Sequence, residues 1–571
     1  MKKLMLGNEA IARGAYEAGV KVVSAYPGTP STEVSECIAR YDEVYAEWAP
    51  NEKVAFEVAI GASFAGARSM VCMKHVGVNV AADPMFTAAY TGVNGGLVIL
   101  AADDPGMHSS QNEQDTRFYA RSAHIPMLEP SDSAEAKEFT KLAFELSEKY
   151  DTPVFVRTTT RLAHSQSLVE TAERREVPLR PYVKDVSKYT MMPSSAIGRH
   201  VAVEAREDKL AVDVNFFDVN REEMNDPSLG IVCSGVVYQY VKEALPEASV
   251  FKLGVVYPLP LGRLRDFASK VERLVVVEEL EPFFQNQLKA NGIDCEGKNL
   301  FSKQGEISVA DIRLKLLGEK LDVEKQDLPV RPPVMCAGCP HRGVFYILNK
   351  LKVTVSADIG CYTLGAQPPL CAVDTVVCMG ASVGIAHGFE KAAGREQSKR
   401  TVAVIGDSTF IHSGITGLIN AVYNKSNITL VILDNSTTGM TGHQQHPATG
   451  LTLKQEPAKI LDIVALCKTV GCDSVRVVDS YDLAEVEKTL KEELAADGVS
   501  VIVAKRPCAL LDRNYPAPCT VSDCRKCGMC FKLGCPAIEK QADGSAKINA
   551  SLCVGCGLCE KVCKFGAIKE G

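Results

Sequence analysis

Eight of the 21 cysteines in this 571-residue chain gather between Cys524 and Cys563. They form two runs. In each run two residues separate successive members of a set of three cysteines, and a fourth cysteine follows farther on: Cys524, Cys527, Cys530 and Cys535, then Cys553, Cys556, Cys559 and Cys563. Three closely spaced thiolates wrap one face of a [4Fe-4S] cube, while the fourth cysteine of such a run ligates the other cluster. We therefore expect a first cluster on Cys524, Cys527, Cys530 and Cys563, and a second on Cys553, Cys556, Cys559 and Cys535.

The cysteine pattern departs from the usual one in two places. Four residues, rather than three, separate Cys530 from Cys535, and Lys564 stands where a second proline is usual. Neither change removes a ligand. Paired Cys-x2-Cys motifs also occur in zinc knuckles, but two runs of four cysteines exceed what tetrahedral zinc requires. The module resembles a bacterial two-cluster ferredoxin, and this resemblance implies that the protein transfers single electrons.

The remainder of the chain has the composition of an ordinary globular protein. Hydrophobic residues make up 46% and charged residues 23%, with a mean hydropathy of +0.00. At roughly 100–200 residues per domain, the length predicts about three to five domains. The net charge of -7 and the lack of long Lys/Arg runs predict no nucleic-acid surface. No apolar run approaches the roughly 18 residues of a membrane span, and the N-terminus lacks the apolar core of a signal peptide, so we expect a cytoplasmic protein without a membrane partner.

Strand-like apolar runs alternate with helix-like stretches along most of the chain, a pattern typical of α/β domains with parallel sheets. We expect one α/β domain over 1–165, an extended charged linker with a small amount of local structure over 166–227, a smaller α/β domain over 228–325, another α/β domain over 326–512, and the cysteine module over 513–571. The expected strands include VFKLGVV in the smaller domain, and VTVSADIG, DTVVCMG, TVAVIGD, ITLVILDN and VSVIVAKR after it. The predicted fold class is multidomain α/β, with two doubly wound parallel-sheet domains, a smaller α/β domain and a ferredoxin-like module.

Two polar side chains end strand-like runs in the domain expected over 326–512. The run TVAVIGDST places Asp407 at the end of one strand, and ITLVILDNS places Asn435 at the end of another. Because ligands bind at the carboxyl ends of the strands in a doubly wound sheet, both residues can face one crevice, where their oxygens suit Mg2+. The spacing resembles the Gly-Asp-Gly…Asn motif of thiamine diphosphate enzymes, with Ser408 in place of the second glycine. Asp and Asn at strand ends are also common in unrelated sheets.

Glycines after another strand complete the expected cofactor site. In VCMGASVGIAHGF, Gly380 and Gly384 open a helix whose backbone donors and dipole suit a diphosphate. The expected cofactor-binding residues are Gly380, Gly384, Gly406, Asp407, Ser408, Asn435 and Thr437, with Asp407 and Asn435 as the Mg2+ ligands.

A glutamate in the first domain gives a second indication of thiamine diphosphate. Glu52, in NEKVAFEVAIGASFAGA, lies on a helix rich in small residues, nine residues before Gly61, and matches the glutamate that thiamine diphosphate enzymes place against the aminopyrimidine. Such a glutamate shares a proton with the ring and thereby helps to activate the thiazolium carbon. Glu57 on the same helix is the alternative, but the register of the following glycines favours Glu52. A solvated helix glutamate is the remaining interpretation.

The order of these parts resembles that of the 2-oxoacid:ferredoxin oxidoreductases over nearly the whole chain. The segments AYPGTPSTE, DDPGMHSSQNEQDTR, CAGCPHRG, DIGCYTLG and MTGHQQHP look like the large α subunits of the indolepyruvate ferredoxin oxidoreductases. The resemblance implies a pyrimidine-binding domain, a transketolase C-terminal-like domain, a diphosphate-binding domain and a ferredoxin domain, in this order. It also implies oxidative decarboxylation of an aryl pyruvate, with coenzyme A taking the acyl group and ferredoxin the electrons.

Three further residues are catalytic candidates. Thr29, in YPGTPS, matches a threonine that the family places near the substrate, although an ordinary turn threonine fits equally well. His341 and His443 could act as acid or base near neutral pH, or they could be structural loop histidines. The same two interpretations hold for Lys74, His75 and His446.

Four other cysteines are candidates for a third cluster close to the thiamine. Related oxidoreductases ligate such a cluster with a Cys-x2-Cys and two remote cysteines, and the matching residues here are Cys336, Cys339, Cys361 and Cys508. The alternative is that these cysteines line the cofactor pocket without binding iron.

Other functions remain open at this level. A non-redox thiamine-dependent decarboxylase would turn over without an electron acceptor, whereas a non-catalytic electron-transfer subunit would be expected to lack Glu52 or Asp407, and both are present. A branched-chain or small 2-oxoacid is the alternative substrate to indolepyruvate, phenylpyruvate or 4-hydroxyphenylpyruvate. Related enzymes carry a γ-type domain that this chain lacks, so we expect a separate small β subunit and, by analogy, an α2β2 complex.

Overall fold

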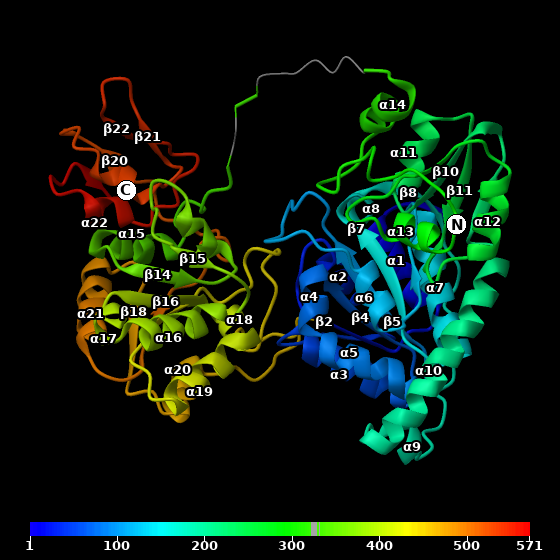
Figure 1. Ribbon diagram of the computed structural model, residues 1–571. Coiled ribbons are helices and arrows are strands. Elements are labelled where there is room, and N and C mark those ends of the chain that lie inside the picture. Colours follow the sequence, from blue (N-terminus) through cyan, green and yellow to red (C-terminus); the bar gives the residue numbers. More distant parts are fainter. Residues whose placement is uncertain (321–327, 330–331) are drawn as a thin grey trace. The chain divides into compact units, whose positions relative to one another are not determined.

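The computed structural model describes residues 1–320, 328–329 and 332–571 (Figure 1). The chain forms two compact units, Met1–Gln326 (unit 1) and Asp327–Gly571 (unit 2). The domain boundary expected between residues 325 and 326 lies outside the described residues. None of the described helices is long and apolar enough to cross a membrane.

The first sheet of unit 1 has seven strands in the order β12-β6-β7-β5-β4-β2-β3, all parallel except β12. These strands are β2 (Val22–Ala25), β3 (Tyr45–Trp48), β4 (Ser69–Lys74), β5 (Leu97–Asp103), β6 (Met127–Leu128), β7 (Val154–Thr159) and β12 (Val255–Tyr257). The central strands β4, β5 and β7 are buried throughout, because helices cover both faces of the sheet (Figure 1). The covering helices include α1 (Gly7–Glu17), α3 (Glu52–Phe64), α5 (Ala82–Thr91) and α7 (Ser133–Tyr150).

The second sheet of unit 1 has the order β13-β10-β11-β9. Its strands are β9 (Arg221–Glu223), β10 (Asp226–Ser234), β11 (Ala248–Leu253) and β13 (Leu274–Val276), and its helices are α11 (Val237–Ala244), α12 (Leu261–Ser269), α13 (Phe283–Ala290) and α14 (Val309–Leu317). The run VFKLGVV, expected to form one strand, divides between two sheets, because β12 pairs antiparallel with β6 of the first sheet. Asn220 fixes the break, since its Oδ1 accepts the N–H groups of Gly254 and Val255, each at 2.9 Å.

A buried arginine connects the two larger sheets of unit 1. Arg117, the first residue of α6 (Arg117–Ser122), donates from Nη1 to Glu278 Oε2 and from Nε to Asp115 Oδ1, each at 2.8 Å. Its Nη2 also donates to the carbonyl oxygen of Glu279. Glu278 and Glu279 follow β13, so this network ties the segment DDPGMHSSQNEQDTR to the smaller domain.

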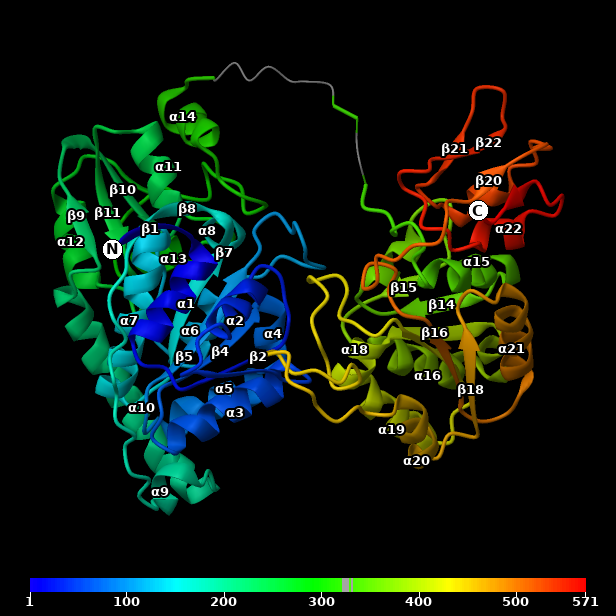
Figure 2. The same cartoon turned by 180° about the vertical axis from the view of Figure 1, so that it is seen from behind.

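The segment 166–227 differs from the extended linker that we expected. It contains β8 (Gln166–Glu170), which pairs with β1 (Lys2–Leu6), a short α9 (Val186–Tyr189) and the 21-residue helix α10 (Pro193–Asp213). The helix runs along one side of unit 1 (Figures 1 and 2). Only Val203, Arg206 and Leu210 of α10 are buried, so its apolar period is too weak to predict a helix from the sequence.

Unit 2 is built on a six-stranded parallel sheet in the order β15-β14-β16-β17-β19-β18. Its strands are β14 (Thr354–Ala357), β15 (Thr375–Val376), β16 (Thr401–Gly406), β17 (Thr429–Asp434), β18 (Ser474–Asp479) and β19 (Ser500–Lys505). Five of them arise from the expected runs, whereas the edge strand β18 was not expected because part of it is exposed and its apolar run is short. The larger helices of this unit are α15 (His341–Leu351), α16 (Ala381–Ala393), α19 (Ile415–Tyr423), α20 (Ile463–Val470) and α21 (Leu483–Ala495).

The cysteine module closes unit 2 with two small antiparallel sheets. In these, β20 (Thr520–Val521) pairs with β23 (Ile568–Lys569), and β21 (Ile538–Lys540) pairs with β22 (Ala546–Ile548). Two short helices, η4 (Met529–Leu533) and α22 (Leu558–Val562), each hold the third cysteine of a run. The module packs on α15 (Figure 2), where Arg342 Nη1 donates to the carbonyl oxygen of Leu533 at 2.7 Å. The α/β fold class with a ferredoxin-like module is thus confirmed.

Candidate active site

Polar side chains gather at the carboxyl ends of the parallel strands of unit 1. Glu52 opens α3 shortly after β3, and Lys74 is the last residue of β4. Thr29 lies in the turn after β2, where it is half-buried and joined to Pro30 by a cis peptide bond. Because β2 pairs in parallel with both β3 and β4, these residues share one edge of the sheet. Doubly wound proteins bind their ligands at this edge.

Burial distinguishes the two candidate glutamates of α3. Glu52 is only 4% exposed, and its carboxyl packs on the backbone of α4 (His75–Val80), where a Cβ at Gly77 would lie 2.7 Å from Glu52 Oε1. The side chain of Glu57 is 44% exposed and pairs with Lys53. Only glycine permits α4 to approach this closely, so Gly77 makes room for the Glu52 carboxyl. Glu57 remains in solvent.

Lys74 is a buried cation beside Glu52. It is 9% exposed, and its Nζ donates to the carbonyl oxygen of Ser109 at 2.8 Å. Asp104 accepts the N–H of Ser109 at 2.8 Å and the hydroxyl of Ser110 at 2.7 Å, which fixes the loop that Lys74 contacts. Burial lowers the pKa of Lys74 to about 8, although the charges of Asp104 and Glu52 act in the opposite direction. The edge therefore carries an amine and carboxylates in a largely buried setting.

Three oxygen-bearing groups meet between the ends of β16 and β17 in unit 2. One arm of the Asn435 side-chain amide lies 3.2 Å from Asp407 Oδ1 and 3.1 Å from the carbonyl oxygen of Thr437. If this arm is the amide nitrogen, it donates hydrogen bonds to Asp407 Oδ1 and to the carbonyl oxygen of Thr437. If it is the amide oxygen, it lies next to these two oxygens, and a cation could bind all three. Mg2+ prefers such hard oxygen ligands and keeps further positions for water and phosphate. The donor set therefore fits the expected cation.

Backbone donors hold the Asp407 carboxylate, and a histidine lies beside it. Oδ1 accepts the N–H of Ser408, and Oδ2 accepts the N–H of Ser436, each at 2.8 Å. His446 Nε2 lies 3.2 Å from Oδ2, so the histidine that reaches this site is His446. Burial raises the pKa of Asp407, while His446 acts in the opposite direction. A divalent cation at this point would stabilise the ionised carboxylate.

A side chain of the protein itself caps the N-terminus of α16. Asp358, which follows β14, accepts the N–H groups of Ala381 at 3.0 Å and Ser382 at 3.1 Å. Burial raises the pKa of Asp358 to about 6, against the effect of these hydrogen bonds. The amides expected to meet a diphosphate beside Gly380 are thus engaged by Asp358, which sequence reasoning missed. The face of α16 at Gly384 is open, since no atom lies within 4 Å of where a Cβ would stand.

The other candidate histidines have different surroundings. His341 starts α15 with its ring 5.9 Å from that of Tyr362, and burial lowers its pKa to about 4. The imidazole is therefore neutral near pH 7, the form in which a histidine can accept a proton. Burial also lowers the pKa of His75, whose Nε2 lies 3.2 Å from the carbonyl oxygen of Asn112. His443 lies beside a thiol, with its Nε2 3.7 Å from Cys508 Sγ.

The four cysteines proposed for a third cluster, here called the four remote cysteines, come together near Asn435. The thiols of Cys336, Cys339, Cys361 and Cys508 are close enough to interact electrostatically. Cys361 Sγ and the Asn435 amide both lie within 4 Å of the position that a Cβ on Gly439 would take. The N–H of Cys508 also donates to the carbonyl oxygen of Asn435 at 2.9 Å. This thiol set is therefore adjacent to the oxygens that fit Mg2+.

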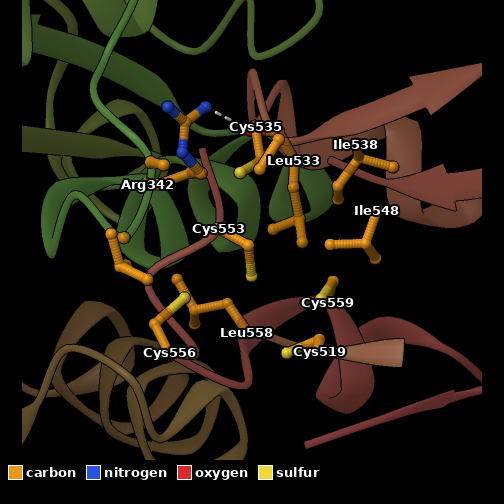
Figure 3. A pocket seen from close by; sticks show the side chains of 14 residues that line it. Arg342, Cys519, Leu533, Cys535, Ile538, Ile548, Cys553, Cys556, Leu558 and Cys559 are labelled. Carbon is orange, nitrogen blue, oxygen red and sulfur yellow. Dashed lines mark hydrogen bonds between the residues drawn. The ribbon is translucent and has the colours of Figure 1, made fainter. Parts of the chain in front are cut away.

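The eight cysteines of the C-terminal module surround two cavities. The first is lined by Cys524, Cys527, Cys530 and Cys563. The second is lined by Cys535, Cys553, Cys556 and Cys559, together with Cys519 (Figure 3). Each cavity thus receives three cysteines from one run and the last from the other, as the two expected clusters require. In the part of the chain that the structure describes, no three His, Cys, Asp or Glu side chains form a group suited to a single metal ion.

The second cavity adjoins the CAGC loop. Gly338 of this loop lines the cavity, and a Cβ at Gly338 would lie 2.3 Å from Val554 Cγ2. Arg342 spans the contact, because it donates to the carbonyl oxygens of Leu533 at 2.7 Å and Cys336 at 2.9 Å. The four remote thiols and the second cavity are therefore neighbours within unit 2.

Three parts of the chain match known protein families. Residues 13–220 match the family described as pyruvate flavodoxin/ferredoxin oxidoreductase, thiamine diphosphate-binding. Residues 358–504 match the C-terminal TPP-binding domain of thiamine pyrophosphate enzymes, and residues 546–569 match a 4Fe-4S binding domain. Thiamine diphosphate and iron–sulfur chemistry are thus assigned to separate parts of the chain.

Two curated proteins align with the chain over its whole length. Each is named "Indolepyruvate oxidoreductase subunit IorA", one from Archaeoglobus fulgidus and one from Pyrococcus horikoshii, and each is 41% identical over 100% of this chain and 97% of the relative. A solved 2-oxoglutarate:ferredoxin oxidoreductase from Magnetococcus marinus, with 2-oxoglutarate, coenzyme A and succinyl-CoA bound, is 19% identical with a TM-score of 0.46. It covers 52% of this chain and 61% of that chain.

Proposed function

Because the chain belongs to the family of the indolepyruvate oxidoreductase subunits IorA, which are thiamine-diphosphate-dependent 2-oxoacid:ferredoxin oxidoreductases, we propose that it decarboxylates aryl pyruvates oxidatively. The substrate is indole-3-pyruvate, with phenylpyruvate and 4-hydroxyphenylpyruvate as further members of the class. Coenzyme A takes the acyl group, ferredoxin takes the electrons, and the products are aryl-acetyl-CoA and CO2. The name carried by the full-length relatives supports this substrate class.

The arrangement of unit 2 carries the proposal, because the oxygens that fit Mg2+, the four remote thiols and the two thiol cavities lie next to one another in this order. Cys508 is hydrogen-bonded through its backbone to Asn435, and the CAGC loop that holds Cys336 lines the second thiol cavity. Cys535 and Cys563 then connect the second cavity to the first through the two cysteine runs. Electron transfer out of a decarboxylation site requires short steps of this kind, whereas a non-redox decarboxylase needs none of them.

Thiamine diphosphate supplies the nucleophilic carbon and the electron sink for this chemistry. The chain's own residues hold and orient the reactants. Glu52 keeps a proton at the aminopyrimidine, and Thr29 lies near the substrate. Asp407, Asn435 and the carbonyl oxygen of Thr437 would hold Mg2+, which would supply positive charge for the diphosphate. The burial of Glu52 supports its role, because it shields the shared proton from water.

Three thiol sets would hold the electron carriers. Cys336, Cys339, Cys361 and Cys508 would hold a third cluster beside the oxygens that fit Mg2+, and the second thiol cavity, which adjoins the CAGC loop, would hold the next one. The first cavity would hold the last cluster before ferredoxin, and each cluster would supply a one-electron carrier. A small β subunit completes the enzyme in an α2β2 complex, in keeping with the subunit name of the relatives.

Anaerobic turnover of the enzyme with its small subunit tests the proposal. We expect absorbance changes of ferredoxin that require both coenzyme A and an aryl pyruvate. Glu52→Gln should abolish the reduction, while Glu57→Gln, at the exposed glutamate of the same helix, should retain it. Release of CO2 without reduction of the acceptor would instead identify a non-redox decarboxylase. Turnover of branched-chain but not aryl 2-oxoacids would refute the substrate class.

A further inference from the structure

The second thiol cavity is lined by five cysteines, although a [4Fe-4S] cluster takes four. Cys535, Cys553, Cys556 and Cys559 are the ligands in the proposed function, on which this inference rests. Cys519, the residue before β20, is the fifth. It belongs to neither cysteine run, and it is only 4% exposed.

Cys519 lies beside two of the proposed ligands. Its side chain lines the same cavity as those of Cys553 and Cys559. Figure 3 shows Cys519 next to Cys559 and away from Cys535. Cys535 faces the cavity from another side, so the position of the fourth ligand does not depend on Cys519.

Once iron is bound, these thiols differ in what they can donate. Cys553 and Cys559 coordinate iron as thiolates and keep no proton, because the thiolate is the metal-binding form of cysteine. A cysteine outside the ligand set keeps its S–H group, which is a weak hydrogen-bond donor. Cys519 can then donate this group to coordinated sulfur.

We propose that Cys519 is a non-ligand thiol that donates a hydrogen bond to the Cys559 thiolate and raises the reduction potential of the second cluster. The reduced cluster carries one more electron than the oxidised cluster, so its sulfur atoms are more negative and gain more from a donor. Hydrogen bonds to cluster sulfurs are among the factors that set these potentials. Cys519 is thus a positioning residue for electron transfer, outside the ligand set.

An anaerobic redox titration of the complete complex, followed by electron paramagnetic resonance, tests the proposal. Cys519→Ala and Cys519→Val remove the donor, and each should lower the potential of one cluster while iron and sulfide contents stay unchanged. A threefold to tenfold change in the redox equilibrium corresponds to about 30–60 mV, since tenfold is 59 mV for one electron. Cys519→Ser retains a donor and should keep the potential near that of the unmodified protein.

Cys467→Ala is the matched control, because Cys467 is a fully buried thiol of α20 in an apolar core of unit 2. It should leave the potentials of all the clusters unchanged. Equal potentials in the Cys519→Ala, Cys519→Val and unmodified proteins would overturn the proposal, and so would loss of one cluster's iron, which would make Cys519 a ligand. The titration uses dithionite and mediator dyes, so its result stands even if aryl pyruvates prove not to be substrates.

Discussion

Replacing Lys74 by methionine should stabilise unit 1 in a way that depends on pH. A lysine amine in water titrates near 10.5, and burial lowers the pKa of Lys74 to about 8. One pKa unit corresponds to about 1.36 kcal/mol, so burying the charged amine costs the folded state about 3 kcal/mol at pH 7. Methionine is also unbranched but carries no charge, so the substitution removes this cost.

The cost changes with pH because the folded and unfolded chains bind the proton differently. Below pH 8 both states carry it, and the cost is complete. Between pH 8 and pH 10.5 the unfolded chain binds the proton and the folded chain does not, so the stability of the unmodified protein rises with pH. By pH 9.5 about 2 kcal/mol is recovered. The hydrogen bond to Ser109 is worth about 1 kcal/mol at either pH, so the expected result is a gap between the two proteins that shrinks by about 2 kcal/mol.

Urea unfolding followed by the fluorescence of Trp48 measures this gap at pH 7 and pH 9.5. Trp48 is the only tryptophan of the chain and ends β3, so it reports on unit 1 even though a chain of several domains need not unfold in one step. Lys53→Met, at an exposed lysine of α3, is the control and should show a much smaller pH-dependent change. A gap between Lys74→Met and the unmodified protein that is the same at both pH values would refute the reasoning.

Asp407→Asn should weaken the binding of thiamine diphosphate with Mg2+ by tenfold or more, about 1.4 kcal/mol, because an amide brings no negative charge to the cation. Calorimetric titration measures the change, and an unaltered affinity would contradict the assignment. Cys336→Ser should lower the iron content by one cluster, whereas Cys371→Ser, at an exposed cysteine, should not. Equal iron contents in the two variants would argue against the third cluster. Arg117→Met should destabilise unit 1 by about 3–5 kcal/mol because it leaves two carboxylates buried and unpaired. The Trp48 unfolding curve tests this last expectation, and a loss below about 1 kcal/mol would contradict it.

Features that depend on spacing along the chain could be predicted from the sequence. The alternation of strand and helix gives the confirmed α/β class, because a buried parallel strand needs a continuous apolar run. The cysteine runs predict two four-thiol sets, and the cavities lined by Cys563 and Cys535 agree with the predicted exchange of the last ligand. The choice of Glu52 over Glu57, which rests on the register of the following glycines, is supported by burial, because Glu52 is buried and Glu57 is exposed. Their roles stay predictions.

Contacts that depend on the path of loops could not be predicted. His446 rather than His443 reaches Asp407, and Asp358 occupies the amides expected for a diphosphate. Cys519 lies outside both cysteine runs, so no spacing rule points to it. The helix α10 was missed for a different reason: it buries only one narrow stripe, and its charged residues conceal the apolar period.

The oxygens that fit Mg2+, the four remote thiols and the two thiol cavities all belong to unit 2. Tunnelling rates depend on the separations between redox centres, and here those separations are set inside one packed body. Internal electron flow should therefore be set by distances within unit 2 alone.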